Sequence, residues 1–140
     1  MTLDNDIIRD VLLCVERECE CYTDESNRFV YQAQMHWKII YEDKYLCSKY
    51  LIDELKYCVI KLLEAGLIVG RIPGPKNIIL YLYIDGLSWE GHKLLNDIKD
   101  DNIWDKIKSK IGSVAKISLP ALSELAVACA TEYYKSQMGL

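Results

Sequence analysis

The sequence lacks the features of a membrane-spanning or exported chain. It has no uncharged apolar run of about 18 residues, the length that a membrane-spanning helix requires. The closest stretch, Ile111–Ala130, is interrupted by Lys116, Pro120 and Glu124. The first residues, Met1–Asp10, have no basic group ahead of an apolar stretch, as a signal peptide would. We therefore expect a cytoplasmic chain without a transmembrane segment.

The usual patterns of catalysis and nucleotide binding are also missing. The chain has two histidines, and no H-E-x-x-H, H-x-E or glycine-rich phosphate-binding motif. His92 is predicted to lie in the first turn of a helix, where the helix dipole favours the neutral imidazole. It has no serine or cysteine partner at a recognisable spacing, so we expect Trp89, Gly91 and His92 to form a packing joint. No enzyme activity, cofactor or small-molecule substrate is predicted.

The cysteines do not follow the spacing of a metal site. Six are scattered along the chain: Cys14, Cys19, Cys21, Cys47, Cys58 and Cys129. Only Cys19 and Cys21 are close, and no second pair or nearby histidine completes a tetrahedral zinc site. We expect reduced, structural cysteines and no metal.

The composition is that of a globular chain with an uneven distribution of charge. Its 140 residues are 51% hydrophobic with a net charge of −4, which suits one compact domain with a substantial core. Residues 1–25 contain eight acids and two arginines, whereas residues 99–116 contain five lysines and three aspartates. An acidic N-terminal helix would repel a nucleic acid backbone, so any DNA contact must come from elsewhere.

Hydrophobic periodicity predicts helices in the first half of the chain. Apolar residues three and four apart indicate a helix over Leu3–Glu20. Residues 22–35 lose that period and are predicted as a loop, followed by a short β-prone stretch, His36–Tyr41. A short helix over Glu42–Tyr50 and a longer one over Asp53–Glu64 follow, with Asp53 as N-cap. Gly66 lies where a helix C-cap belongs.

The second half begins with a hairpin signal. Two β-prone runs, Leu67–Val69 and Ile78–Ile84, flank a Pro/Gly-rich turn at residues 73–77, and Asp85-Gly86 is predicted to close the hairpin. Ser88 is then a natural N-cap for the next helix. Helices are also predicted over Asn102–Ile111 and from Leu119 onward, joined by small residues at 112–118.

This order predicts an α+β, mostly helical fold: a winged helix-turn-helix with a two- to three-stranded wing sheet and a C-terminal helical extension. Residues 1–100 would form the winged-helix domain, and residues 101–140 the extension, packed on that domain or on a partner. Such a fold occurs with many functions, so it does not by itself predict one.

DNA binding is the first functional hypothesis. In a helix-turn-helix the second helix enters the major groove, and the wing contacts the backbone or minor groove. The candidate contact residues are three on the helix and three on the wing: Lys56, Tyr57, Lys61, Arg71, Lys76 and Asn77. However, residues 42–66 hold five acids against four lysines, so this surface is close to neutral. Because phosphate neutralisation supplies much of the affinity, DNA binding would be weak or depend on a dimer.

Protein interaction is the second hypothesis. The final helix carries an apolar stripe available to a protein partner or a second copy, formed by Leu119, Leu122, Leu125, Ala126, Cys129 and Tyr133. The opposite side is polar, with Glu124, Thr131 and Lys135 among its residues. The alternative is that the stripe packs only on its own domain.

Several stretches resemble a known family. Lys61–Ile68 reads KLLEAGLI, and Leu87–Lys99 reads LSWEGHKLLNDIK with Trp104 shortly after. Both are similar to the family called domain of unknown function 2513, whose members are small proteins of bacteria and phages. They typically read L-T-W-[DE]-G-H-[EQ]-F-L-D-x-I-R. Leu3–Arg9 and Ser118–Ser123 also resemble that family, so the similarity covers most of the chain.

The resemblance implies a winged-helix fold in a phage or prophage protein, and no established activity. Four positions depart from the usual motif: Ser88 for threonine, Leu94 for phenylalanine, Asn96 for aspartate and Lys99 for arginine. The sequence therefore predicts a non-enzymatic regulatory module with a hypothetical DNA-binding role. The alternative is an adaptor or homodimerisation module that does not bind DNA.

Overall fold

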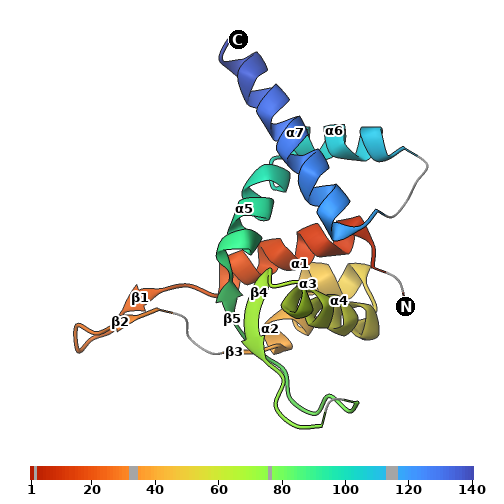
Figure 1. The fold of residues 1–140 in the computed structure, drawn as a ribbon. Coiled ribbons are helices and arrows are strands. Elements are labelled where there is room, and N and C mark those ends of the chain that lie inside the picture. Colours follow the sequence, from red (N-terminus) through yellow and green to blue (C-terminus); the bar gives the residue numbers. More distant parts are fainter. Residues whose placement is uncertain (2, 32–34, 76, 113–116) are drawn as a thin grey trace.

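The computed structural model describes residues 1, 3–31, 35–75, 77–112 and 117–140, and helices predominate in it (Figure 1). The helices are α1 Asn5–Glu18, α2 Lys38–Tyr41, α3 Lys44–Lys49, α4 Ile52–Glu64, α5 Trp89–Ile98, α6 Asp101–Ile111 and α7 Leu119–Gln137. The strands are β1 Tyr22–Thr23, β2 Phe29–Val30, β3 Met35–His36, β4 Ile68–Arg71 and β5 Tyr83–Leu87. The predicted α+β, mostly helical class is therefore confirmed.

Helix α1 forms the centre of the core. Asp4 caps it by accepting a hydrogen bond from the Asp6 amide at 2.8 Å. Its apolar residues recur at helical spacing, so one face carries Ile8, Val11 and Leu12 into the interior, where all three are buried. It contacts α2, α4, α5 and β5. The helix predicted over Leu3–Glu20 is confirmed, with ends two residues shorter at each side.

The segment predicted as a loop at residues 22–35 contains a short hairpin. Strands β1 and β2 pair antiparallel and project from the body as an arm (Figure 1). Asp24 organises the turn by accepting hydrogen bonds from the amides of Ser26 and Arg28, both at 2.9 Å. Asn27 takes the positive φ of 60° that such a turn needs. The sequence prediction missed this hairpin because its strands have two residues each.

The three-stranded sheet has the antiparallel order β3-β5-β4, and it corrects two predictions. The stretch His36–Tyr41 is mostly helix α2. The pairing of β3 with β5 ends at His36, and the next amide, that of Trp37, donates a hydrogen bond to the Leu82 carbonyl at 3.0 Å. The second hairpin strand begins at Tyr83 rather than Ile78, since Tyr83 pairs with Arg71 and leaves residues 72–75 and 77–82, here called the wing, outside the strands.

Residues Asp85 and Gly86 were predicted to close the hairpin, and this is wrong. Both lie within β5, where Gly86 pairs with Val69. Two prolines, Pro73 and Pro75, lie in the wing and lack the backbone N–H that a ladder uses. The chain therefore re-enters the sheet only after them, and later than the β-prone residue types suggest.

Helices α3 and α4 are close to the predicted pair of helices. Asp43 caps α3 by accepting from the Leu46 amide at 3.0 Å. Helix α4 begins at Ile52, so Asp53 lies inside its first turn and is not the N-cap as predicted. The N-cap position is Leu51, whose amide is satisfied by the Glu54 carboxylate at 3.0 Å. The helix ends before Gly66, which has the expected positive φ of 76°.

Helices α5, α6 and α7 complete the molecule. Ser88 caps α5, and Asp100 caps α6 by accepting from the amides of Asn102 and Ile103. Helix α7 lies across α5 and α6, and its C-terminal end projects from the body (Figure 1). Its buried residues belong to the same continuous core as those of α1. Among the described residues, no helix is long and apolar enough to span a membrane.

Candidate interaction surfaces

Of the predicted DNA contacts, Lys56, Tyr57 and Lys61 lie on α4 and Asn77 on the wing, while Arg71 is the last residue of β4. The outer side of α4 and the wing are here called the α4–wing face. Lys56 joins its two parts, because its ammonium lies 3.4 Å from the Ile79 carbonyl of the wing. Tyr57 lines a hollow with Ile79, and Asn77 is exposed on the wing. Lys76 lies outside the described residues. The structure therefore brings Lys56 and Tyr57 together beside the wing.

The described cations on and beside this face, Lys56, Lys61 and Arg71, contact groups of the protein itself. The Lys56 ammonium lies 5.5 Å from the centre of the Trp37 ring, and the Arg71 guanidinium 5.7 Å from that of Tyr83. Lys61 pairs with Glu64 at 3.0 Å, and this hydrogen bond raises the pKa of Lys61. A phosphate backbone would have to compete with these contacts, which lowers the free energy available for DNA binding.

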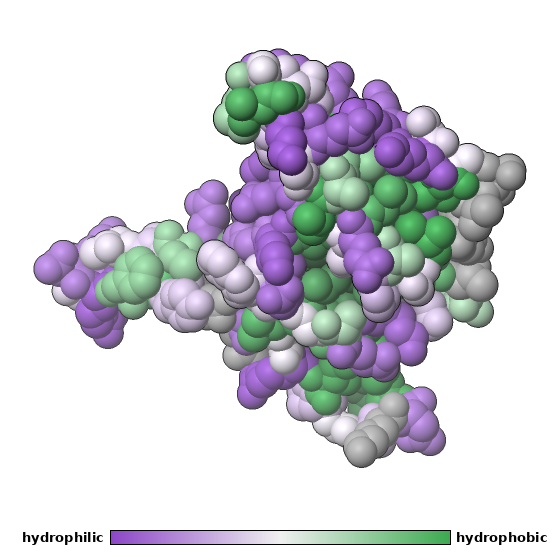
Figure 2. Space-filling view, turned by 45° about the horizontal axis from the view of Figure 1, so that its top comes forward, coloured by the Kyte–Doolittle hydropathy of each residue, from purple (hydrophilic) through white to green (hydrophobic). Residues whose placement is uncertain are grey.

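The same face exposes large apolar side chains. The exposed fractions are 54% for Ile52, 56% for Ile78 and 65% for Leu80. Beside them is a hollow of about 350 Å³, lined by Met1, Asp53, Lys56, Tyr57, Ile60 and Ile79. Hydrophobic residues are visible on the wing at the bottom of Figure 2. The sequence prediction missed this feature because it placed Ile78–Ile84 in a strand, where alternate residues would be buried.

The apolar stripe predicted on the last helix is placed differently. Leu122, Ala126 and Cys129 are fully buried, while Leu119, Leu125 and Tyr133 are half-buried against the core. Helix α7 makes its contacts with α5 and α6 of the same chain. The stripe is therefore covered by its own chain, which agrees with the alternative that the sequence left open.

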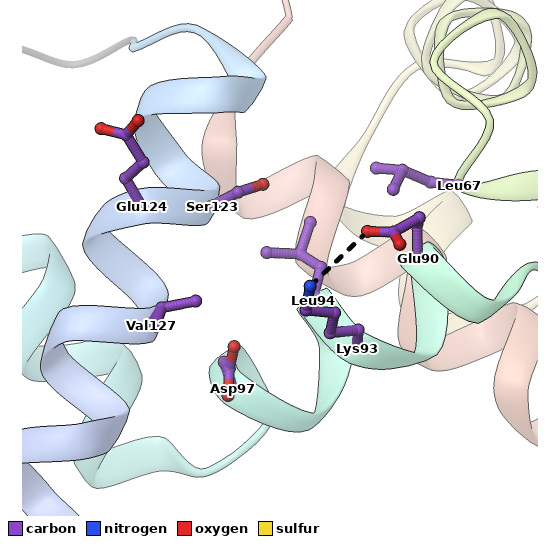
Figure 3. Close-up of a pocket in the computed structure, with 8 residues that line it drawn as sticks. All are labelled: Leu67, Glu90, Lys93, Leu94, Asp97, Ser123, Glu124 and Val127. Carbon is purple, nitrogen blue, oxygen red and sulfur yellow. Dashed lines mark ion pairs between the residues drawn. The ribbon is translucent and has the colours of Figure 1, made fainter.

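A second candidate surface is a groove between α5 and α7, here called the α5–α7 groove (Figure 3). Its volume is about 350 Å³, and its lining residues are Leu67, Glu90, Lys93, Leu94, Asp97, Ser123, Glu124 and Val127. Leu67 and Leu94 are buried and form the apolar floor, while the Val127 side chain points in from α7. The sequence prediction missed the groove, because its residues come from three elements far apart in the chain.

The edges of the groove are acidic. Glu90 and Asp97 lie on α5, and Glu124 lies on α7. Lys93 is the cation of the lining, and its ammonium is 4.0 Å from Glu90, so it offsets one carboxylate. Partial burial raises the pKa of Asp97, although Lys93 acts in the opposite direction. The lining therefore has a net negative charge at neutral pH.

Contacts at the start of α5 account for two residues of the motif Leu87–Lys99, Ser88 and Gly91. The Ser88 hydroxyl accepts from the Gly91 amide at 3.0 Å and donates to the Gly66 carbonyl at 2.5 Å. A Cβ atom on Gly91 would lie 2.0 Å from the Leu67 carbonyl oxygen, so only glycine fits there. Ser88 and Gly91 thus join the turn after α4 to the start of α5.

Trp89 and His92 do not belong to this joint, contrary to the prediction. Trp89 is 80% exposed, and His92 is also exposed. Both line a small hollow of about 180 Å³, together with Cys19, Cys21, Tyr31, Asp85, Gly86 and Leu87. Burial raises the pKa of the Cys19 thiol to about 11, so this thiol stays protonated at neutral pH. Among the described residues, no group of His, Cys, Asp and Glu could hold a metal ion.

Comparison with known proteins agrees with the motif. The family described as "Hypothetical protein (DUF2513)" matches residues 2–117, which is well over half of the chain. The chain belongs to this family. The match ends just before α7, so the DUF2513 region contains both the α4–wing face and the α5 wall of the groove.

A relative from Haemophilus influenzae, named "Uncharacterized protein", is 26% identical over 126 residues. The alignment covers 86% of this chain and 88% of the relative. No solved structure matches the chain. The DUF2513 family is thereby established, and what the chain binds has to be argued from its surfaces.

Proposed function

We propose that this DUF2513 protein is a non-enzymatic winged-helix module that forms a homodimer through its α4–wing face. The fold part rests on the element order α1, β3, α2–α3, α4, β4, β5 and on the strand order β3-β5-β4. In a winged helix the first strand pairs with the last strand of the hairpin, and the helix before that hairpin faces outward. Helix α4 occupies this position beside the wing.

The observation that carries the proposal is the chemistry of that helix and wing. Ile52, Ile78 and Leu80 are exposed on this face, and the described lysines of α4, Lys56 and Lys61, already contact groups of the chain itself. An apolar surface of this kind is more characteristic of protein contacts than of nucleic acid contacts, which depend on available positive charge. A protein surface is therefore the better partner.

A second copy is the partner we favour, because the face carries complementary features. The wing projects with Ile78 and Leu80 on it, and the adjacent hollow is lined by Tyr57 and Ile60. A two-fold symmetric dimer requires that a projection and a matching hollow lie on the same surface of one subunit. Each wing would then enter the hollow of the other subunit.

Light scattering coupled to size exclusion tests this proposal over a dilution series. We expect a particle of twice 16.2 kDa that dissociates on dilution. Leu80→Glu should weaken the dimer at least tenfold, about 1.4 kcal/mol, by placing a charge in the interface. The matched control is Phe29→Glu, which adds the same charge at an exposed apolar residue of the arm and should leave the dimer unchanged. A monomer at every concentration, or equal effects of both substitutions, contradicts the proposal.

The DNA-binding hypothesis is the second candidate, because the element order favours it even though the charges do not. It predicts a salt-dependent mobility shift with duplex DNA that the double substitution Lys56→Glu and Lys61→Glu abolishes. The dimer proposal predicts no such shift. A shift that survives in Leu80→Glu would favour DNA contact by a monomer.

The non-enzymatic part of the proposal is supported by the state of the thiols and histidines. Burial, together with the Asp43 carboxylate, raises the pKa of Cys14 to about 12, so this thiol is a poor nucleophile at neutral pH. His92 lines the hollow with Cys19, whose pKa is also raised. A hydrolytic turnover lost in His92→Ala at unchanged thermal stability would contradict this part. A phage or prophage setting, implied by the family resemblance, stays a prediction.

A further inference from the structure

We propose that the α5–α7 groove is the docking site for a basic amphipathic helix of a protein partner. This goes beyond the homodimer, because the groove lies on α5 and α7 rather than on the α4–wing face. The cavity of about 350 Å³ is within the range of ligand-binding pockets, roughly 300–1,000 Å³. Its floor of Leu67 and Leu94 would receive apolar side chains of the partner.

Charge determines which partner fits. Asp97 lines the groove on α5, and Glu124 lies at its outer edge on α7, with its side chain directed away from α5 in Figure 3. The structure assigns neither carboxylate an ion pair within its described residues. A docked lysine or arginine would therefore meet carboxylates that are not already neutralised. The groove would repel nucleic acid and anionic lipid headgroups, so neither competes as its ligand.

The spacing of the carboxylates along α5 favours an extended partner such as a helix over a small organic cation. Glu90 and Asp97 are two turns apart on α5, which places them about 10 Å apart along its axis at a rise of about 1.5 Å per residue. A helix that docks in a groove presents apolar residues at three- and four-residue spacing, with polar residues on either side. Basic residues beside that stripe would lie near these carboxylates.

A designed peptide tests the proposal directly. The probe is a fluorescein-labelled, 15-residue peptide of leucine and lysine with leucines at helical spacing, titrated with the intact protein and followed by fluorescence anisotropy. We expect binding that weakens with added salt, because exposed charges are screened. The double variant Asp97→Asn and Glu124→Gln should bind at least tenfold more weakly, since both substitutions keep the size of the side chain and remove its charge.

Two controls separate docking from general attraction to an acidic protein. The variant Glu25→Gln and Glu42→Gln removes the same charge at exposed residues away from the groove, and should change the affinity less than twofold. A peptide with glutamate in place of lysine should bind at least tenfold more weakly than the probe. Val127→Lys should also weaken the probe, because it places a charge of the same sign as the peptide against the apolar stripe. Circular dichroism melting confirms that each variant is folded.

The outcomes are distinct from those of the dimer experiment. Failure of the leucine–lysine peptide to bind overturns the groove proposal, as does equal affinity for the groove variant and its control. Binding that Leu80→Glu reduces and the groove variant does not would place the peptide on the α4–wing face, and also overturns it. None of these results depends on whether the protein is a dimer.

Discussion

The α4–wing face and the α5–α7 groove share apolar residues at their centres, and they differ in the state of their charges. On the first, Lys56 and Lys61 are engaged by groups of the chain itself. On the second, Asp97 and Glu124 lie beside an apolar floor and form no ion pair among the described residues, although Lys93 acts on Asp97. Where the charged groups of a surface already contact the chain itself, apolar contact determines which partner binds. Where charged groups are not paired within the chain, they favour a partner of opposite charge.

The two surfaces also meet at one joint. The turn after α4 contacts the start of α5 through Ser88 and Gly91, and Leu67 of that turn lines the groove. A substitution at the joint should therefore affect both surfaces, while substitutions on either one should leave the other intact.

Gly91→Ala should have the largest effect. Alanine normally stabilises a helix relative to glycine by roughly 0.5–1 kcal/mol, but here its Cβ would lie 2.0 Å from the Leu67 carbonyl oxygen. Backbone must shift to relieve this overlap, so we expect a loss of about 3 kcal/mol in the free energy of unfolding. Urea denaturation measures it. Asn96→Ala, at an exposed position of the same helix, should change stability by less than about 0.5 kcal/mol. Similar values for both variants would contradict the joint.

Arg9→Ala should have the next largest effect, on the groove side. Its guanidinium donates to the carbonyls of Ile98 and Lys99 and to the Asp101 carboxylate, each at 2.8 Å. It thereby ties α1 to the junction of α5 and α6, and it also lies 5.4 Å from the centre of the Trp104 ring. We expect a loss of about 2 kcal/mol, because the carbonyls of Ile98 and Lys99 lose a charged donor.

The matched control for Arg9→Ala is Arg28→Ala, which removes an exposed ion pair with Asp24 on the arm. Such pairs contribute about 0–1 kcal/mol. Urea denaturation compares the two variants, and amide hydrogen exchange shows where the loss occurs. Faster exchange in α4 than in α5 and α6 of Arg9→Ala would contradict the proposed role of Arg9.

Asp97→Asn should have the smallest effect, with a sign that depends on pH. Burial raises the pKa of Asp97 in the folded protein above its value in the unfolded chain, in spite of Lys93. The folded state then binds more protons, so the charged carboxylate lowers stability as pH rises through this range. Asp97→Asn should melt at a slightly higher temperature than the parent protein at pH 7.

Melting curves between pH 3 and pH 7 measure this, and the difference between the two proteins should shrink toward pH 3. A difference that grows as pH falls would mean that the carboxylate is stabilised in the folded state. A carboxylate at Asp97 that lowers the stability of the folded protein is consistent with a group that is retained because it binds a partner.

Local signals in the sequence were sufficient for most of the fold. Helical spacing predicted α1, α4 and α5–α7, and Ser88 and Gly66 were correctly read as the cap and the end of helices. These features depend on neighbouring residues alone. The strand boundaries failed because Tyr83 pairs with Arg71 across the sheet, which β-propensity does not encode.

The candidate surfaces were less accessible from the sequence. The α4–wing face was predicted in position, but the engagement of Lys56 by the Ile79 carbonyl depends on how the wing folds back. The exposure of Leu80 depends on the same loop. The groove combines Leu67, Asp97 and Glu124 from three elements, and no spacing in the sequence relates them. Such arrangements follow from tertiary packing, so residue patterns alone do not predict them.

Hydrogen exchange at increasing protein concentration tests the central claim most directly, because it reports which surface becomes covered on self-association. We predict slower amide exchange over residues 52–61 and 77–81 as concentration rises, with no change over residues 89–98 and 119–127. Protection confined to the two groove helices, or no change at any concentration, would contradict the assignment of the α4–wing face as the dimer surface.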